Sequence, residues 1–318
     1  SRVIAEKVEQ LKLEAEKELL RIDKMGGAVA AIENSYMKSA LVSANARRLA
    51  NIESGAQTVV GVNRFTEAEA SPLTTGAAAF LSIDPQAEEQ QIALLEQWRA
   101  ARDEASVARA RAALEAAARE GRNIMEPSIA AAHAGLTTGE WCHTLRQVFG
   151  EFRAPTGVSG ASGPATGNNE AAAARVQAVS EKLGRRLKML IGKPGLDGHS
   201  NGAEQIAVRA RDAGIDVVYE GIRLTPQQIV ATALEEGVHV IGLSILSGSH
   251  NTLAGEIMAG LKEAGLEDVP VIVGGIIPQA DAKALLKTGI ARVYTPKDFD
   301  LDAIIADIAG IVERSSGL

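Results

Sequence analysis

Five short apolar runs recur between residues 187 and 294, and a stretch with helical periodicity follows each of them. The runs lie near residues 187–191, 215–219, 238–243, 270–274 and 291–294. They are apolar on both faces, as expected for the strands of a parallel sheet covered by helices. With right-handed crossovers, the pattern predicts a flavodoxin-like, doubly wound, five-stranded parallel α/β domain.

The loop after the first predicted strand, residues 193–202, combines glycines with charged and imidazole side chains. Ligands of open α/β sheets bind at the carboxyl ends of the strands, where this loop lies. Glycines allow a bulky ligand to approach the backbone closely. Their spacing matches neither of the common phosphate-binding fingerprints, so a nucleotide is not the first expectation.

Three residues of this loop suggest a metal site. A neutral imidazole binds a metal through one nitrogen and commonly donates its other N–H to a carboxylate. His199 follows Asp197 by two residues, and Lys193 could stabilise the charge of that aspartate. Because the loop offers one side-chain ligand, the metal would have to arrive already chelated.

Three motifs, each following a predicted strand, resemble the cobalamin-binding domain of the base-off, His-on class. They are Asp197-x-His199-x-x-Gly202, Ser244-x-Leu246 and Gly274-Gly275. The resemblance implies that His199 is the lower axial ligand of cobalt and that Asp197 and Lys193 support it. The other residues expected to contact the cofactor lie in or near these loops: Gly195, Gly198, Gly202, Ser244, Leu246, Gly248, Gly274, Gly275 and Thr295.

Some of these residues could instead have a purely structural role. Asp-Gly-His-Ser is also a common turn, with Asp and Gly chosen for backbone geometry, but that interpretation leaves the two later motifs unexplained. His239 lies in the third predicted strand and is expected in the core. His250 follows a Ser-Gly-Ser turn at the ligand-binding edge, so a contact with the cofactor stays open.

The residues before the sheet are mainly helical in pattern. We expect a region at 1–153, a flexible linker at 154–169 and the cobalamin-binding domain at 170–318. The first region is expected to contain the following elements: helices at 1–24 and 28–50, a strand at 58–65, a loop at 66–79, an extended run at 78–83, two antiparallel helices within 86–120, a helix at 123–134 and a capping box from Thr137 to Glu140.

These segments resemble the region between barrel and cobalamin domain in acyl-CoA mutases. Residues 150–157 resemble the ethylmalonyl-CoA type more than the methylmalonyl-CoA type. The resemblance implies adenosylcobalamin as cofactor, a radical carbon-skeleton rearrangement and a (β/α)8 substrate barrel, supplied in cis or trans. It assigns no catalytic residue to this chain. We therefore expect the chain alone to bind cobalamin without isomerising a CoA ester; homodimers are possible.

Three other functions remain open. The chain could be part of a methylmalonyl-CoA mutase, because substrate contacts belong to the barrel. It could be a corrinoid carrier for methyl transfer. Such modules usually carry a short helical bundle before the cobalamin domain, so the long helical region and the predicted strand argue against a carrier. A cobalamin-based sensor would need a DNA-binding segment, and no basic recognition helix is evident.

Composition narrows the environment of the chain. Its 318 residues are 46% hydrophobic, and its net charge of -7, with both signs interspersed, argues against nucleic acid as a partner. A single cysteine, Cys142, fits a reducing cytoplasm. We recognise no signal peptide and no apolar run that approaches a membrane span. Ser1 lies inside a helical pattern, so we expect the chain to be part of a longer polypeptide.

Overall fold

The computed structural model describes residues 1–67, 85–158, 169–298 and 300–318. Internal contacts divide the chain into two compact units: unit 1 is residues 1–68 with 154–318, and unit 2 is residues 69–153. Residues 1–67 thus belong to the same unit as the sheet, whereas the sequence analysis grouped them with the helices up to residue 153. The expected domain boundaries themselves stay a prediction.

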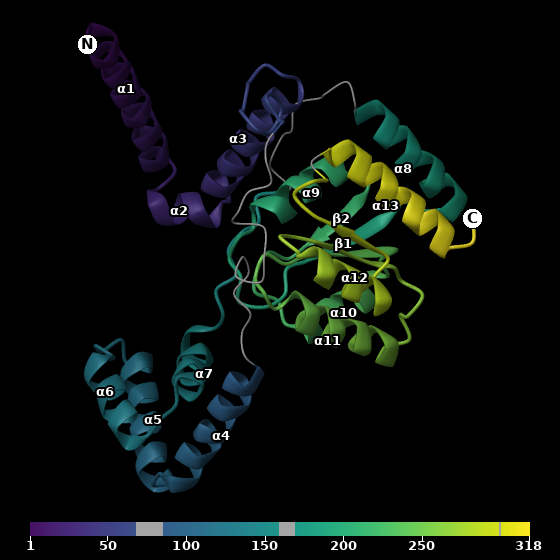
Figure 1. Ribbon diagram of the computed structural model, residues 1–318. Helices are drawn as coiled ribbons and strands as arrows, with labels where there is room; N and C mark the ends of the chain where they lie inside the picture. The colour runs from purple at the N-terminus through teal and green to yellow at the C-terminus, as the bar shows by residue number, and fades with distance from the viewer. Residues whose placement is uncertain (68–84, 159–168, 299) are drawn as a thin grey trace. The chain divides into compact units, whose positions relative to one another are not determined.

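Unit 1 contains a five-stranded parallel sheet in the order β2-β1-β3-β4-β5; Figure 1 labels its strands β1 and β2. Its strands are β1 (Lys188–Gly192), β2 (Asp216–Tyr219), β3 (Val240–Ser244), β4 (Val271–Gly274) and β5 (Arg292–Tyr294). This is the flavodoxin-like order, so the predicted fold class is confirmed. Ser244 is in register with Gly274, and Gly274 with Tyr294, so these strands end at one edge.

Helices cover both faces of the sheet (Figure 1). One hydrophobic cluster joins the sheet to α8 (Asn169–Leu183), α9 (Asn201–Asp212) and α13 (Leu301–Ser315). A second cluster joins the opposite face to α10 (Pro226–Glu236), α11 (His250–Glu263) and α12 (Gln279–Lys287). Burial on both faces explains why most residues of the strands are apolar.

Three further helices belong to unit 1: α1 (Arg2–Lys24), α2 (Ala28–Glu33) and α3 (Tyr36–Glu53). One continuous helix was predicted at 28–50, and this prediction is wrong, because the structure has two helices there with a break between them. Ser35 has a left-handed backbone with φ of 65°, and the side chain of Asn34 accepts a hydrogen bond from the N–H of Tyr36. This local turn ends α2 and starts α3.

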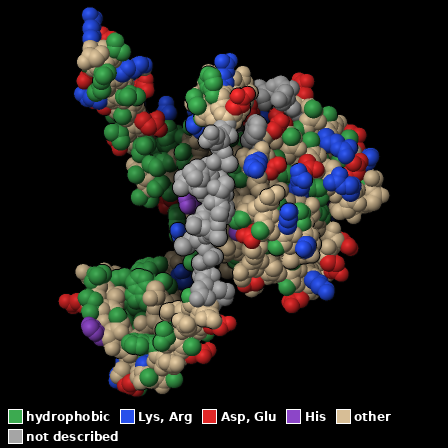
Figure 2. Space-filling model, in the orientation of Figure 1, with side chains coloured by type: hydrophobic (Ala, Val, Ile, Leu, Met, Phe, Trp, Pro, Cys, Tyr) green, Lys and Arg blue, Asp and Glu red, His purple; other side chains and the backbone are tan. Residues whose placement is uncertain are grey.

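The large apolar side chains of the first helix lie at the surface. No residue of α1 is buried, and Ile4, Leu11 and Leu19 are each about three-fifths exposed. Figure 2 shows hydrophobic side chains among charged ones along this helix. Exposed apolar area of this kind is typical of surfaces that pack on another element or partner.

The strand predicted at 58–65 is absent from the structure. The segment forms a tight loop with one isolated bridge between Val60 and Arg64. The side chain of Asn63 accepts a hydrogen bond from the N–H of Val59 and donates to the carbonyls of Ile52 and Gln57. An asparagine that satisfies the local backbone in this way replaces the neighbouring strand that a β-rich segment would need.

Unit 2 contains α4 (Pro85–Ala101), α5 (Glu104–Arg119), α6 (Met125–Ala134) and α7 (Thr138–Phe149). Two helices between 86 and 120 were predicted correctly. Their expected packing was not, because α5 packs mainly on α6 and α7. Buried small residues, including Ala117, Ala118 and Ala131, allow that close approach. The predicted capping box of Thr137 and Glu140 is confirmed.

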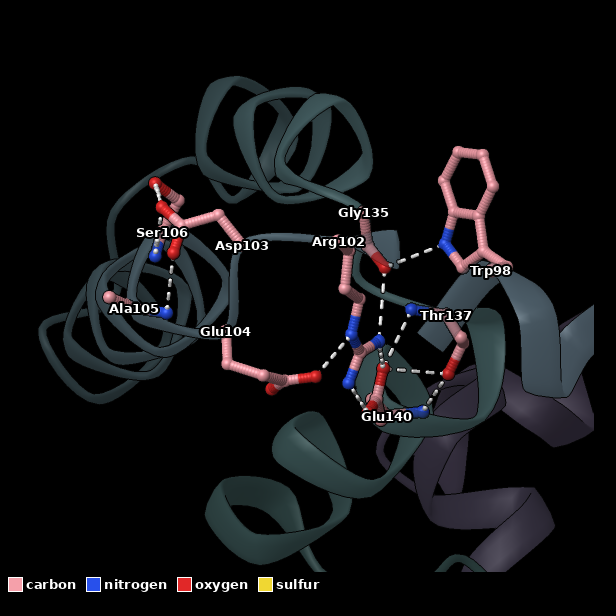
Figure 3. Close-up of polar contacts among 9 residues, drawn as sticks. All are labelled: Trp98, Arg102, Asp103, Glu104, Ala105, Ser106, Gly135, Thr137 and Glu140. Atoms are coloured by element: carbon pink, nitrogen blue, oxygen red, sulfur yellow. Dashed lines mark hydrogen bonds and ion pairs between the residues drawn. The ribbon is translucent and has the colours of Figure 1, made fainter. Parts of the chain in front are cut away.

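Glu140 links that capping box to the end of α4 (Figure 3). Its two carboxylate oxygens accept hydrogen bonds from the Arg102 guanidinium, each at 2.7 Å. Arg102 also donates to the carbonyl of Gly135, which accepts a second bond from the indole N–H of Trp98. The bidentate bond from Arg102, against the opposing effect of burial, lowers the pKa of Glu140 to about 2.

Three predicted segments are described only in part or not at all. The loop predicted at 66–79 lies outside the described residues from residue 68 onward. The extended run at 78–83 lies outside the described residues, as do residues 159–168 of the predicted linker. The linker's first residues pack within unit 1: Val158 is buried, its carbonyl accepts a hydrogen bond from Arg211, and Ser39 donates to the carbonyl of Gly157. Within the described ranges, no helix is long and apolar enough to cross a membrane.

Candidate functional site

The backbone of the loop after β1 is fixed by the loop after β2. The N–H of Gly195 donates to the carbonyl of Leu224, and the N–H of Leu224 donates to the carbonyl of Lys193. Gly195 has a φ of 79°, and a Cβ there would lie 2.9 Å from Cδ1 of Leu253. Both features favour glycine, which lets the chain turn sharply before Asp197.

Asp197 is the centre of a compact polar cluster. Its Oδ2 accepts a hydrogen bond from Nζ of Lys193 at 2.7 Å, and its Oδ1 lies 2.7 Å from Nδ1 of His199. The backbone N–H of His199 also donates to Oδ1 at 3.0 Å. The Lys193 side chain is 0% exposed and that of Asp197 is 5% exposed. The structure thus brings together the three residues that the sequence analysis grouped.

The same cluster reaches the loop after β3. The ammonium of Lys193 donates to the carbonyl of Ser244 at 3.3 Å, and the N–H of Leu246 donates to Oδ2 of Asp197 at 3.2 Å. The first and second motifs are therefore joined by hydrogen bonds as well as by position. This contact fixes the imidazole-bearing loop to two strands of the sheet.

The charge of Asp197 determines which nitrogen of His199 is available. Burial alone would raise the pKa of the Asp197 carboxyl, but hydrogen bonds from Lys193 and from the backbone of His199 hold that pKa well below its ordinary value. An ionised carboxylate only accepts hydrogen bonds, so Nδ1 of the neutral imidazole carries the proton. Nε2 then carries the lone pair, on a side chain that is 83% exposed.

A cavity of about 430 Å³ lies beside the cluster, at the carboxyl ends of β1, β3, β4 and β5. We call it the slot. It lies between the sheet, α9 and α13, and its apolar lining includes Met189, Ile191, Ile206, Leu243, Ile272, Ile304 and Ile308. A concave apolar site with a few polar groups at its rim is typical of a small-molecule site.

Six predicted residues line the slot: Gly202, Ser244, Leu246, Gly274, Gly275 and Thr295. Gly275 is required by packing, since a Cβ there would lie 1.9 Å from the carbonyl oxygen of Ile245. Gly274 differs, because a Cβ there would meet no atom within 4 Å. The absence of a side chain at Gly274 therefore keeps space open beside the end of β4.

The remaining predicted residues lie outside the slot. Lys193, Asp197 and His199 form the polar cluster, and Gly195 shapes its loop. Gly198 is exposed within the same loop, and Gly248 is exposed in the turn before α11. Thr295, at the slot, donates its backbone N–H and its hydroxyl to Asp298, so part of its polar capacity is already used.

His250, which the sequence analysis left open, and His239, which it expected in the core, both have structural contacts. His250 is 3% exposed, and its Nε2 lies 2.9 Å from a carboxylate oxygen of Asp281, which ties α11 to α12. His239 lies just before β3, where its Nδ1 accepts a hydrogen bond from the N–H of Lys188. That position is at the amino ends of the strands, away from the slot.

Sequence reasoning missed one wall of the slot. Asn45, Arg48 and Leu49 of α3 line it together with the residues of the sheet domain. Their spacing places them on one helix face, which is a local signal. The sequence separation of roughly 150 residues from α9 left no indication of which surface that face would meet.

The family model for methylmalonyl-CoA mutase matches residues 3–151, and that for the B12 binding domain matches residues 187–298. Ethylmalonyl-CoA mutase of Cereibacter sphaeroides is 58% identical over 98% of this chain, and that of Methylorubrum extorquens is 53% identical over 99%. The chain is homologous to the acyl-CoA mutases.

Among these mutases, the ethylmalonyl-CoA type is the more similar. Human mitochondrial methylmalonyl-CoA mutase is 35% identical over 86% of the chain and is matched over 37% of its own length. The chain covers 48% and 46% of the two ethylmalonyl-CoA mutases. It therefore spans about half the length of the curated relatives that it matches.

Proposed function

We propose that this chain binds adenosylcobalamin with the benzimidazole of the cofactor displaced from cobalt and His199 in its place. In this proposal the chain is the cofactor-carrying part of an acyl-CoA mutase of the ethylmalonyl-CoA type. The observation that carries the proposal is the contact between Asp197 and Nδ1 of His199. It leaves Nε2 as the free ligand atom, on an exposed side chain beside an apolar slot.

The residues present fit such a cofactor. A corrin supplies four of the ligands of cobalt, so one imidazole from the protein is enough for the lower position. Among the described residues, no group of three or more His, Cys, Asp or Glu side chains could hold a bare metal ion. The displaced benzimidazole is apolar and flat, and the slot offers an apolar lining of isoleucines.

Each member of the polar cluster has a distinct role in this proposal. Asp197 fixes the tautomer and orientation of His199 and makes its imidazole a better donor to cobalt. Lys193 keeps Asp197 ionised, and its buried ammonium anchors the cluster to β3 through the carbonyl of Ser244. When bound, adenosylcobalamin supplies the radical chemistry of the rearrangement, and the protein supplies position and shielding.

Turnover requires a part that the cluster and slot do not provide. A radical must be shielded from solvent over the upper face of the corrin, and a (β/α)8 substrate barrel performs this role in our proposal. The exposed stripe of α1 supports a packing partner for this chain. The chain alone should bind cobalamin without turning over a CoA ester, and a competent barrel added in trans should restore turnover.

A corrinoid carrier for methyl transfer remains the alternative from another class. One argument against it has fallen, since the strand predicted at 58–65 is a loop. The helical region before the sheet and the similarity to ethylmalonyl-CoA mutases over nearly the whole chain support the mutase proposal. Methyl transfer from bound methylcobalamin to a thiol or folate would favour the carrier.

The deciding experiment is electron paramagnetic resonance of cob(II)alamin bound to uniformly 15N-labelled chain with unlabelled cofactor. A doublet splitting from 15N means that a protein nitrogen binds cobalt, and His199→Ala should abolish it. His250→Ala is a suitable control, because its imidazole faces Asp281. A triplet from 14N in the wild-type chain would mean that the cofactor keeps its own base, and the proposal would be wrong.

A further inference from the structure

Helix α3 packs on the sheet domain through one face. Val42 is fully buried and belongs to the hydrophobic cluster that α8, α9 and α13 form. Ala46 and Ala50, one and two helical turns further on, are also buried. This apolar stripe sets the rotation of α3 and therefore decides which residues face the slot.

Polar contacts fix α3 along the whole of α9. Near the start of α3, Lys38 pairs with the buried carboxylate of Glu204 at 2.7 Å. In the middle, the amide of Asn45 donates to the side chain of Asn201 at 2.8 Å. At the end, Glu53 accepts a hydrogen bond from Arg209 at 2.8 Å. A buried carboxylate is costly without its cation, so the Lys38 contact is the one that α9 most requires.

A neighbouring face of α3 lines the slot. Its residues there are Asn45, Arg48 and Leu49. Arg48 and Asp298 are the charged residues of the described lining. Asp298 already accepts hydrogen bonds from Thr295. No hydrogen bond or ion pair joins the exposed guanidinium of Arg48 to another described residue. The slot therefore has a positive group at its rim and an apolar interior.

The nucleotide tail of cobalamin has a matching division of chemistry. Its benzimidazole is apolar, and the phosphodiester that joins it to the corrin carries one negative charge. Guanidinium groups bind phosphate through paired N–H donors. An apolar base inside the slot would place an anion nearer the rim, where a cation is needed.

We infer that α3 is the outer wall of the slot and that Arg48 binds the phosphodiester of the cobalamin tail. This inference rests on the proposed function and adds a specificity residue from outside the B12 binding domain. It makes Arg48 selective for corrinoids with a complete nucleotide, since cobinamide, which ends before the phosphate, offers it no partner.

The test compares adenosylcobalamin with adenosylcobinamide, using equilibrium dialysis against the full chain. Arg48→Ala should weaken binding of adenosylcobalamin by about tenfold, the effect of one charge-assisted hydrogen bond at a partly exposed site. Binding of adenosylcobinamide should stay unchanged, and Arg48→Lys should recover part of the loss. Arg47→Ala is the matched control, because it removes the same charge from the neighbouring exposed position, which does not line the slot.

The outcomes separate this inference from the proposed function. If the wild-type chain shows the 15N splitting but Arg48→Ala binds adenosylcobalamin as tightly as wild type, the role of Arg48 is wrong and the ligation by His199 stands. If Arg47→Ala weakens the binding of adenosylcobalamin as much as Arg48→Ala does, the effect of Arg48 is general electrostatic attraction and the inference is wrong. The inference is also wrong if Arg48→Ala weakens the binding of adenosylcobalamin and adenosylcobinamide equally. If no 15N splitting is seen, the proposed function and this inference fail together.

Discussion

The carboxylate of Asp197 lies 2.7 Å from Nδ1 of His199 and thereby decides which imidazole nitrogen faces solvent. The two residues are separated by one glycine, so a single turn sets both the tautomer and the direction of the ring. The buried ammonium of Lys193 on the other carboxylate oxygen keeps this arrangement charged. A sequence of seven residues thus places an imidazole, the carboxylate that orients it and a buried ammonium in one loop.

Replacing Asp197 with Asn should weaken cobalamin binding by about 10- to 100-fold, as loss of a supporting carboxylate does at other metal-binding histidines. The amide keeps the shape of the side chain but removes the negative charge that orients His199. Binding titration followed by absorbance measures the affinity, and the 15N splitting reports ligation. Asp268→Asn, at an exposed site in the turn between α11 and β4, is the control. Unchanged affinity and unchanged splitting in Asp197→Asn would contradict this role.

Lys193 and Asp197 should be strongly coupled in stability. Asp197→Ala leaves an ammonium that is 0% exposed without its carboxylate, which typically costs about 3–5 kcal/mol. Adding Lys193→Met removes the stranded charge and should restore a substantial part of that loss. Urea unfolding of wild type, both single variants and the double variant gives the coupling. A double variant that is less stable than Asp197→Ala would show that the pair does not act as a unit.

Much of the sheet domain could be predicted because its signals are local. The apolar runs lie within about two residues of the observed strands, and their number and spacing leave few topologies open. The polar cluster was also predictable, since Asp197 and His199 share one loop. The family resemblance supplied the assignment to cobalt, which geometry alone left open.

The predictions that failed depend on contacts between residues far apart in the sequence, or on the hydrogen bonds of a single side chain. Asn63 turns a β-rich segment into a loop by binding its own backbone, which residue propensity does not reveal. Arg48 lines the slot because Val42 packs in a core formed mainly by residues far along the chain. Nothing in the pattern of either segment specified that partner.

Two adjacent glycines should respond differently to the same substitution. Gly275→Ala places a Cβ 1.9 Å from the carbonyl oxygen of Ile245, so the backbone must move and unit 1 should lose about 3 kcal/mol. Gly274→Ala meets no atom within 4 Å and should change stability by less than about 0.5 kcal/mol. Urea unfolding followed by circular dichroism compares them. Equal stability of the two variants would mean that the strand-end loops adapt freely.

Acid should destabilise unit 2 through Glu140. Its pKa is about 2 in the folded chain against an ordinary 4.5, so its stabilising effect is complete above about pH 5 and is lost as the pH falls towards 2. The full difference corresponds to roughly 3 kcal/mol, and about 2 kcal/mol is expected, because the side chain is 24% exposed and solvent screens part of the interaction.

Tryptophan fluorescence measures that effect selectively, since both tryptophans, Trp98 and Trp141, lie in unit 2. Glu140→Gln should lose about 2 kcal/mol in urea unfolding at pH 7, and the difference from wild type should shrink as the pH falls towards 2. Glu96→Gln, at an exposed position of α4, should keep the wild-type pH dependence. If Glu140→Gln follows the same pH curve as wild type, the bond from Arg102 does not stabilise the fold.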